Sequence, residues 1–376
     1  MQRSLLLLLF FAVAASAQGQ DATAATPAPA PPPPDPLAAP APYQVGKLKV
    51  SLLGDGYYVY NANHPENRIN TFYNFDDLDK FQLNMARMAV DLDPAPVGFH
   101  FEVGAGRAYQ IIHFWEPKDV GKWSEFLPQM YVTLKPASWK GLQFDFGKFY
   151  TSAGAEVTET YPNWNYSRSL LFSFGPYYHF GLRVNKPWND HFSTGVQVVN
   201  GWNNILDNNS GKTVGITTAA TMGKFAWANN YYFGPEQNGV TSNFRHFYDT
   251  VLTYTMNEHL ATYFNMDIGR EKFAPSTSSG WIGVAGAAHI GLTKRLFFSP
   301  RIELYNDYDG WATGTPQRIK ELTLTGEYKL HKALNARVEY RHDWSNVASF
   351  TMGPNMDPLS HQNTFAVGLI ALLGKM

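Results

Sequence analysis

The chain has 376 residues, with 30 basic and 31 acidic side chains and a formal net charge of −1. Because nucleic-acid-binding domains usually carry a basic excess, we expect no nucleic-acid partner. The sequence contains no cysteine, which excludes disulfides, thiolate metal sites and a catalytic cysteine.

The first 17 residues have the pattern of a secretory signal peptide. Arg3 supplies a positive charge, residues 5–14 form an apolar run, and Ala15-Ser16-Ala17 offers the small residues of a cleavage site. The alternative is a transmembrane anchor, but a spanning helix needs about 20 apolar residues. We therefore expect cleavage near Ala17 and export of the mature chain.

Residues 18–45 form the next expected segment, which is rich in Ala and Pro and includes APAPPPPDP from Ala28. Such a composition buries no core and favours an extended, polyproline-like chain. We assign residues 18–45 to a periplasmic linker and residues 46–376 to one barrel domain. A contact between the linker and the cell wall is the weaker alternative.

From Gly46 onwards, segments of about ten residues alternate apolar and polar side chains and are separated by turn residues, which is typical of a transmembrane barrel. About 16 strands are expected on this pattern. They cover residues 47–60, 81–92, 97–106, 127–136, 141–150, 174–186, 190–202, 212–221, 224–233, 244–255, 259–271, 280–291, 295–307, 319–329, 333–344 and 363–374.

The connections between these strands alternate between short and long. Short turns such as DPAP at Asp93 and MGK at Met222 are interleaved with long loops at 61–80, 107–126, 151–173, 203–211, 234–243, 272–279, 308–318 and 345–362. Outer-membrane barrels show this asymmetry, with short periplasmic turns and longer external loops. A soluble β-sandwich would not require every second loop to be short.

Each expected strand has one apolar and one hydrophilic face. In 333–344, for example, Arg337 and Glu339 alternate with Ala336 and Val338. No helices are expected that would cover the apolar faces as a second layer. We therefore expect lipid outside and water inside, and a closed barrel, because an open edge in lipid leaves backbone groups unpaired. The predicted fold class is an all-β transmembrane antiparallel β-barrel.

One stretch carries a family resemblance. It includes Gly147-Lys148-Phe149, then residues 154–156, and Asn165-Tyr166-Ser167-Arg168-Ser169-Leu170-Leu171-Phe172; it is supported by NGWNN from Asn200 and by YYVYN from Tyr57. On these residues the mature chain resembles the outer-membrane beta-barrel porin-2 (OmpL-like) family. The resemblance implies a pore-forming barrel in the outer membrane of a Gram-negative bacterium. One departure is the C-terminus, Leu373-Gly374-Lys375-Met376, where such barrels usually end in an aromatic residue.

The loop at 151–173 is the longest, and we expect it to fold into the barrel and narrow the pore. Its Glu156, Glu159 and Arg168 are the candidate constriction residues, because opposing charges set the field in a narrow pore. In the alternative interpretation they only tie the loop to the wall as a structural plug. Both signs occur among the expected lumen charges, which are Asp145, Arg183, Asp267, Arg301, Glu303, Lys329, Arg337, Glu339 and Arg341. We therefore predict no strong ion selectivity.

Catalytic and metal motifs are weak. His179, Ser193 and the Asp190-His191 pair form no recognisable nucleophile–base arrangement, so we expect no enzyme, no metal and no cofactor. The expected function is an outer-membrane porin for passive diffusion of small hydrophilic solutes or ions, with membrane lipid as its other partner and, by analogy with wide porins, a homo-trimeric state. The alternatives are a plugged, solute-specific barrel and an adhesive barrel without general pore activity.

Overall fold

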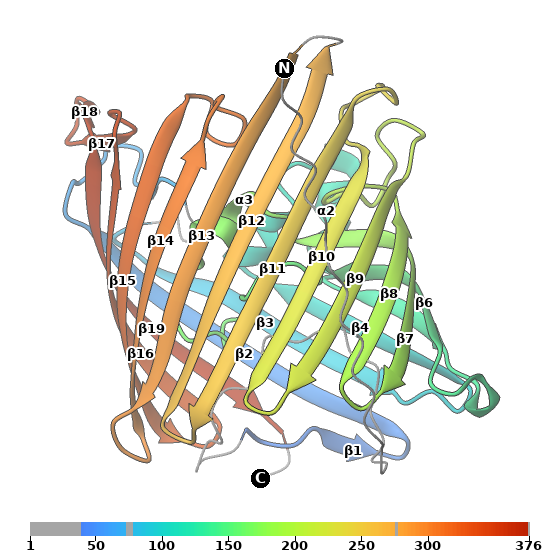
Figure 1. Cartoon of the computed structure of the whole chain (residues 1–376). Helices are drawn as coiled ribbons and strands as arrows, with labels where there is room; N and C mark the ends of the chain where they lie inside the picture. Colours follow the sequence, from blue (N-terminus) through green and yellow to red (C-terminus); the bar gives the residue numbers. More distant parts are fainter. Residues whose placement is uncertain (1–38, 73–77, 275–276, 375–376) are drawn as a thin grey trace.

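The structure is a computed structural model that describes residues 39–72, 78–274 and 277–374 (Figure 1). The expected signal peptide, most of the linker and the last two residues lie outside this range. Among the described residues, none of the helices combines the length and apolar character that a bilayer-crossing helix needs.

All sixteen expected strands are present, and each pairs antiparallel with its neighbours. The last strand pairs with the first, with Phe365 opposite Tyr60, so the sheet closes into a barrel. The strands are β2 (Leu48–Asn61), β3 (Phe81–Leu92), β4 (Val97–Ala105), β5 (Met130–Leu134), β6 (Gln143–Tyr150), β7 (Tyr178–Asn189), β8 (Phe192–Val199), β9 (Thr213–Met222), β10 (Phe225–Pro235), β11 (Phe244–Asn257), β12 (Leu260–Ala274), β13 (Thr277–Gly291), β14 (Leu296–Asp307), β15 (Gln317–His331), β16 (Leu334–Ser345) and β19 (His361–Leu373).

A seventeenth strand, β1 (Tyr43–Val45), lies in the segment that the sequence analysis assigns to the linker. It pairs with β2 at residues 48–50, next to the point where β19 stops at Leu373 opposite Leu52. β1 therefore continues the ring of strands at the end of the barrel where the chain enters β2 and leaves β19.

The side chains alternate between the two faces of the wall. In β16, Arg337, Glu339 and Arg341 are buried inside the barrel, whereas Val338 between them is 59% exposed on the outside. An exposed apolar outer face is the surface that lipid requires, since hydrocarbon cannot satisfy polar groups. The all-β barrel predicted from this alternation is confirmed.

The loops contain short helical segments that the alternation pattern does not predict. The structure has α1 (Arg107–Ile112), α2 (Lys118–Ser124), α3 (Leu170–Phe174) and the 3-10 turn η1 (Ala137–Trp139), and the last long loop holds the hairpin β17 (Phe350–Met352) and β18 (Asp357–Leu359). Each helix has only one or two turns, which is too short for a readable apolar period. They exist because tertiary packing holds them, not because of intrinsic helix propensity.

Several strand boundaries also differ. β7 begins at Tyr178 instead of 174, because α3 occupies residues 170–174. The β7–β8 turn lies at residues 190–191, later than the expected turn at 187–189 between the strands 174–186 and 190–202. β12 and β13 run through most of the expected loop at 272–279 and form a long hairpin at the loop end of the barrel (Figure 1).

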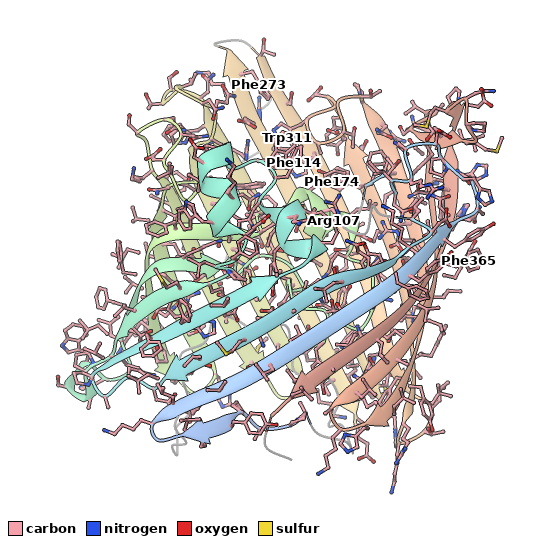
Figure 2. The ribbon with its side chains drawn as sticks, turned by 180° about the vertical axis from the view of Figure 1, so that it is seen from behind. Arg107, Phe114, Phe174, Phe273, Trp311 and Phe365 are labelled. Carbon is pink, nitrogen blue, oxygen red and sulfur yellow. The ribbon has the colours of Figure 1, made fainter. Side chains whose placement is uncertain are left out.

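The wall is low on one side. β5 has five residues, and α1 and α2 follow the short strand β4 on the loop side of the barrel (Figure 2). Tyr109 of α1 packs in an apolar cluster with Leu53 and Tyr57 of β2, Met85 of β3 and Tyr166. The simple alternation rule predicts a uniformly polar interior, and the structure differs from this prediction. It contains an apolar core under α1.

Candidate functional site

The candidate site is the bore and the inner loop, residues 151–177, which connects β6 to β7. Near its start, the Ser152 hydroxyl donates a hydrogen bond to Asn230 of β10 at 2.6 Å. Further along, the backbone N–H of Ala155 donates to Asn265 of β12 at 3.0 Å. At Thr160, the hydroxyl donates to Asp55 of β2. The inner loop therefore contacts the wall on well-separated strands.

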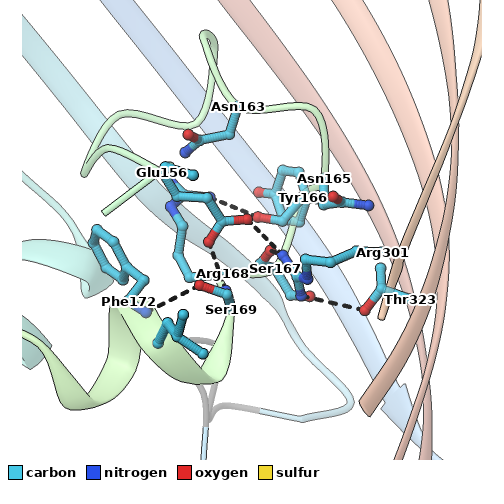
Figure 3. Close-up of polar contacts among 12 residues, drawn as sticks. Glu156, Asn163, Asn165, Tyr166, Ser167, Arg168, Ser169, Phe172, Arg301 and Thr323 are labelled. Atoms are coloured by element: carbon cyan, nitrogen blue, oxygen red, sulfur yellow. Dashed lines mark hydrogen bonds and ion pairs between the residues drawn. The ribbon is translucent and has the colours of Figure 1, made fainter. Parts of the chain in front are cut away.

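Glu156 joins the inner loop to the opposite wall. Its Oε1 lies 2.6 Å from Nη1 of Arg301 on β14, and its Oε2 accepts the N–H of Ser169 at 2.6 Å (Figure 3). Arg301 also donates to the Ser167 carbonyl at 2.9 Å. Both members of the ion pair are almost completely buried. Because an unpaired buried charge is strongly unfavourable, this pair fixes the loop in position.

The segment Asn165–Ser169 carries most of the remaining anchors. The N–H groups of Tyr166 and Ser167 both donate to the Glu339 carboxylate of β16, at 2.6 and 2.9 Å. The Tyr166 hydroxyl donates to Asp55 at 2.6 Å. The family-like motif thus corresponds to a backbone segment that is clamped by wall carboxylates.

Arg168 has a different environment. Its guanidinium donates to the carbonyls of Val157, Tyr166 and Thr158 at 3.0, 2.7 and 2.7 Å, all within the inner loop. Burial lowers the pKa of Arg168 from its usual value. Arg168 therefore cross-links the loop to itself and gives it a fixed shape.

Glu159 points towards β3 and β4. Its carboxylate lies 3.6 Å from Nη1 of Arg87, and the same nitrogen is 2.5 Å from Glu102. Burial raises the pKa of Glu159, the nearby Glu102 carboxylate raises it further, and Arg87 opposes the shift. The three candidate constriction residues thus lie on one loop but in three separate environments: the β14 wall, the β3–β4 wall and the loop itself.

All nine candidate lumen charges are buried inside the barrel. Most lie in ion pairs along or across strands: Arg183 with Asp145 at 2.9 Å, Arg341 with Asp343 at 2.8 Å, and Arg337 with Glu327 at 2.6 Å. Arg301 also lies 3.3 Å from both Glu303 and Glu321. Lys329 lies over the Phe297 ring at 4.9 Å. Asp267 faces Asp249 across the β11–β12 pair.

The wall opposite the inner loop has small side chains where the loop approaches. Gly283 and Ala285 of β13 lie beside Leu171 and Leu170, and a Cβ added at Gly283 would lie 2.8 Å from Leu171. The N–H groups of Leu170 and Leu171, at the start of α3, donate to Glu303 at 2.8 and 3.3 Å. Small residues on β13 and a carboxylate on β14 thus form a seat for α3.

Sequence reasoning missed several members of this network. Asp55 holds three inner-loop and wall groups, yet its neighbours on the inner face of β2 are Leu53 and Tyr57, so that face does not look polar. Glu102 was also missed, although it lies at an alternating position that the strand period would place inside. Among the residues that the structure describes, no group of three His, Asp or Glu is placed to hold a metal ion.

Comparison with solved structures supports the barrel architecture. The anion-selective porin from Comamonas acidovorans superposes with a TM-score of 0.59 at 11% identity, over 87% of this chain and 99% of that porin. The trimer form of OmpT from Vibrio cholerae gives 0.57 at 11% identity, over 88% and 100%. OmpF from Salmonella typhi, in complex with daunomycin, gives 0.56 at 14% identity, over 87% and 97%. At such low identities these likenesses establish the fold alone.

Sequence comparison gives the family. Among curated proteins, no sequence matches the chain. The family described as "Putative beta-barrel porin-2, OmpL-like" matches residues 47–373, which is almost the whole barrel. The chain therefore belongs to this OmpL-like porin family of outer-membrane channels.

Proposed function

We propose that the protein is a diffusion porin that passes small hydrophilic solutes or ions through a bore narrowed by its inner loop. The observation that carries the proposal is the Glu156–Arg301 ion pair of 2.6 Å, which ties the loop to β14 deep inside a closed barrel. A barrel of about sixteen strands encloses an aqueous channel unless something fills it. A loop held across that channel reduces its diameter.

The charges in the bore bear on selectivity. Arg183, Arg337 and Arg341 are matched by Asp145, Glu327 and Asp343 in short ion pairs. These paired charges are balanced in sign, whereas rings of charged side chains of one sign are one device that makes a pore charge-selective. The proposed channel therefore discriminates weakly between small cations and anions.

The experiment that tests this function is planar-bilayer recording of the folded, mature chain. We expect stepwise, ohmic conductance from the wild type and a larger unit conductance when residues 161–171 are deleted, because this removes the Tyr166 and Arg168 anchors of the loop. A deletion within the external hairpin, residues 350–359, is the matched control and should leave the conductance unchanged. Equal conductance in the wild type and the inner-loop deletion would rule out narrowing by this loop.

A plugged, solute-specific barrel is the second candidate function. It is favoured by the burial of the loop charges and by the apolar core that Tyr109 and Tyr166 form inside the wall. In this case the wild type would be silent in simple salts, and the inner-loop deletion would conduct. The same recordings therefore distinguish the two candidates.

The assembly and the cellular location extend the proposal. OmpT of Vibrio cholerae is described in a trimer form, and we propose a homo-trimer for this chain as well, inserted in outer-membrane lipid after cleavage of the signal peptide near Ala17. Mass measurement of the detergent-solubilised protein, with N-terminal sequencing of the mature chain, tests both points. A monomer in every detergent, or an intact N-terminus, would contradict them.

A further inference from the structure

A second cavity, separate from the inner-loop anchors, lies at the loop end of the barrel. It has a volume of about 380 Å³, within the range of roughly 300–1,000 Å³ that small-molecule sites occupy. It is formed by the end of the inner loop and by the connections that follow α1, β8, β10 and β14; Figure 2 labels Phe174 and Trp311 of its lining. Its lining combines aromatic rings with amide and charged groups.

A stacked cation forms one wall of this cavity. The guanidinium of Arg245 lies 4.7 Å from the Trp202 ring and 4.8 Å from the Trp311 ring. Its Nε and Nη2 both donate to Glu271, at 3.0 and 2.9 Å, and the indole N–H of Trp311 donates to the same carboxylate. Trp281 stacks on Trp311 at 3.8 Å. The positive charge of Arg245 in this wall is therefore already paired with the Glu271 carboxylate.

Polar groups also line the cavity. Glu236 accepts the backbone N–H of Trp202 at 2.8 Å and the Thr213 hydroxyl, and burial raises the pKa of this carboxyl. The amide nitrogen of Asn208 donates to the Glu236 carbonyl and to Asn238, both at 3.0 Å, while its amide oxygen is buried and has no hydrogen-bond partner among the described residues. With Asn203, Asn204 and Asn238, this residue lines the cavity with side-chain amides.

An exposed aromatic ring lies at the rim. Trp115 is 77% exposed although it lines the cavity. Its adjacent residue Glu116 is held in place, since it accepts the Tyr178 hydroxyl at 2.8 Å and the Ile205 N–H at 2.7 Å. The position of Trp115 on the backbone is therefore fixed while its ring remains accessible to a ligand.

We propose that this cavity, which we call the vestibule, binds a neutral, hydroxyl-rich ligand of the sugar class. The proposal rests on the proposed function, because it names the solute that the channel would receive. A sugar ring presents C–H groups that pack against the electron-rich face of an aromatic ring, and hydroxyls that both donate and accept. The vestibule offers one such face at Trp115, and side-chain amides at Asn203, Asn204 and Asn238 that can both donate and accept.

Other ligand classes fit less well. An anionic ligand would meet Glu236 and a single cation, Arg245, that is already paired with Glu271. A quaternary ammonium is held best between several free aromatic faces, but Trp311 already contacts Trp281 and Arg245, which leaves only the Trp115 face among these rings of the described lining. The balance of charge and the occupied rings therefore favour a neutral polyol.

The test uses the full mature barrel in detergent, with maltose and cellobiose as probes and glucuronate as the charged comparison. We expect saturable changes in tryptophan fluorescence with the neutral sugars at about millimolar concentration, and weaker binding of glucuronate. Trp115→Ala should weaken sugar binding up to about tenfold, because it removes the exposed ring against which the sugar packs. Trp188→Ala is the matched control, because Trp188 is also an exposed tryptophan but lies next to the periplasmic β7–β8 turn.

Conductance separates this inference from the proposed function. If the wild type conducts ions and the neutral sugars reduce its current in a Trp115-dependent way, both are supported. If it conducts but neither sugar binds up to about 100 mM, or if Trp115→Ala and Trp188→Ala behave alike, the sugar site is rejected and the porin remains. Sugar binding by a barrel that is silent in salt would reject free diffusion but keep the site.

Discussion

At the scale of single residues, carboxylates hold the interior together. They accept hydrogen bonds from backbone N–H groups and form ion pairs with arginine side chains. Glu339 holds two N–H groups of the inner loop, Glu303 holds two more, and Glu156 reaches Arg301. Charge-assisted hydrogen bonds of this kind are about twice as strong as neutral ones. The loop position therefore depends on a few identifiable acids.

The first prediction concerns Glu156. Glu156→Gln removes the charge opposite Arg301 but leaves Arg301 next to Glu303 and Glu321. We expect a loss of about 1–3 kcal/mol of stability in the folded barrel and a higher, noisier conductance, because the loop is released from β14. The measurement is the heat-unfolding midpoint on gels together with single-channel recording. Glu159→Gln is the control on the same loop, since its nearest cation is 3.6 Å away; equal effects of the two changes would contradict the assignment.

The second prediction concerns His113, which follows α1. Its Nδ1 donates to the Tyr109 carbonyl at 2.6 Å, so its Nε2 is the acceptor for the Lys148 ammonium at 2.5 Å. Burial, together with the charge of Lys148, lowers the pKa of His113 to about 3. A depressed histidine pKa stabilises the folded state above the usual value of 6.5, and this contribution is lost as the pH falls towards 3.

The test is the unfolding midpoint of wild type and His113→Gln between pH 7 and pH 4. We expect the wild type to lose stability on acidification and the variant to lose less, because glutamine can still accept from Lys148 and has no proton to gain. His191→Gln is a control, since His191 is exposed in the β7–β8 turn. Parallel pH profiles for wild type and His113→Gln would show that His113 does not titrate in this way.

Residue-level prediction from sequence succeeded where the strand period was clear. Alternation placed Arg337, Glu339 and Arg341 on one face of β16, and the structure buries that face. It did not identify Asp55, because its neighbours on the inner face of β2 are Leu53 and Tyr57, which pack with Tyr109 of α1. The sequence also did not predict which charges pair with each other, since partners such as Glu156 and Arg301 are 145 residues apart in the chain.

At the scale of elements, the inner loop fits because the wall leaves room for it. Gly368 of β19 lies under the Tyr166 ring, and a Cβ built there would be 2.2 Å from the ring. Gly283 of β13 makes similar room for Leu171. Glycine at these two strand positions permits close approach of the loop.

The third prediction follows from this contact. Gly368→Ala forces the Tyr166 ring away from the wall, weakens its hydrogen bond to Asp55 and destabilises the barrel by about 1–3 kcal/mol. Gly326→Ala on β15 is the matched control, because a Cβ there meets its nearest neighbour at an ordinary 3.4 Å. Heat-unfolding midpoints of both variants check this; a Gly368→Ala barrel as stable as the control would show that Tyr166 does not pack as described.

Elements differ in how far sequence predicts them. The strands were predicted from sixteen segments in which apolar and polar side chains alternate, and all sixteen are present. Short helices such as α3 were not predicted, because five residues are too few to show a helical period. The start of α3 is stabilised by the Ser169 cap and by Glu303, which accepts its first N–H groups. The long loops could be located but not shaped, since their conformation depends on contacts with distant strands.

At the scale of the whole molecule, lipid outside and hydrogen-bonded charge inside explain both the composition and the closure. The outer face exposes apolar side chains such as Val338 and Phe365, and the sixteen strands leave no open edge. The low wall at β4–β6 and the helices α1 and α2 break the symmetry of the cylinder (Figure 2). A single closed sheet thus positions both the inner loop and the vestibule.

The most direct test is a planar-bilayer recording of the folded wild-type chain under a salt gradient. A narrowed, hydrated bore with paired charges predicts ohmic unit steps and a reversal potential close to zero. Protein that is shown to be folded by its heat-dependent gel shift, and yet leaves the bilayer silent, would contradict a conducting bore.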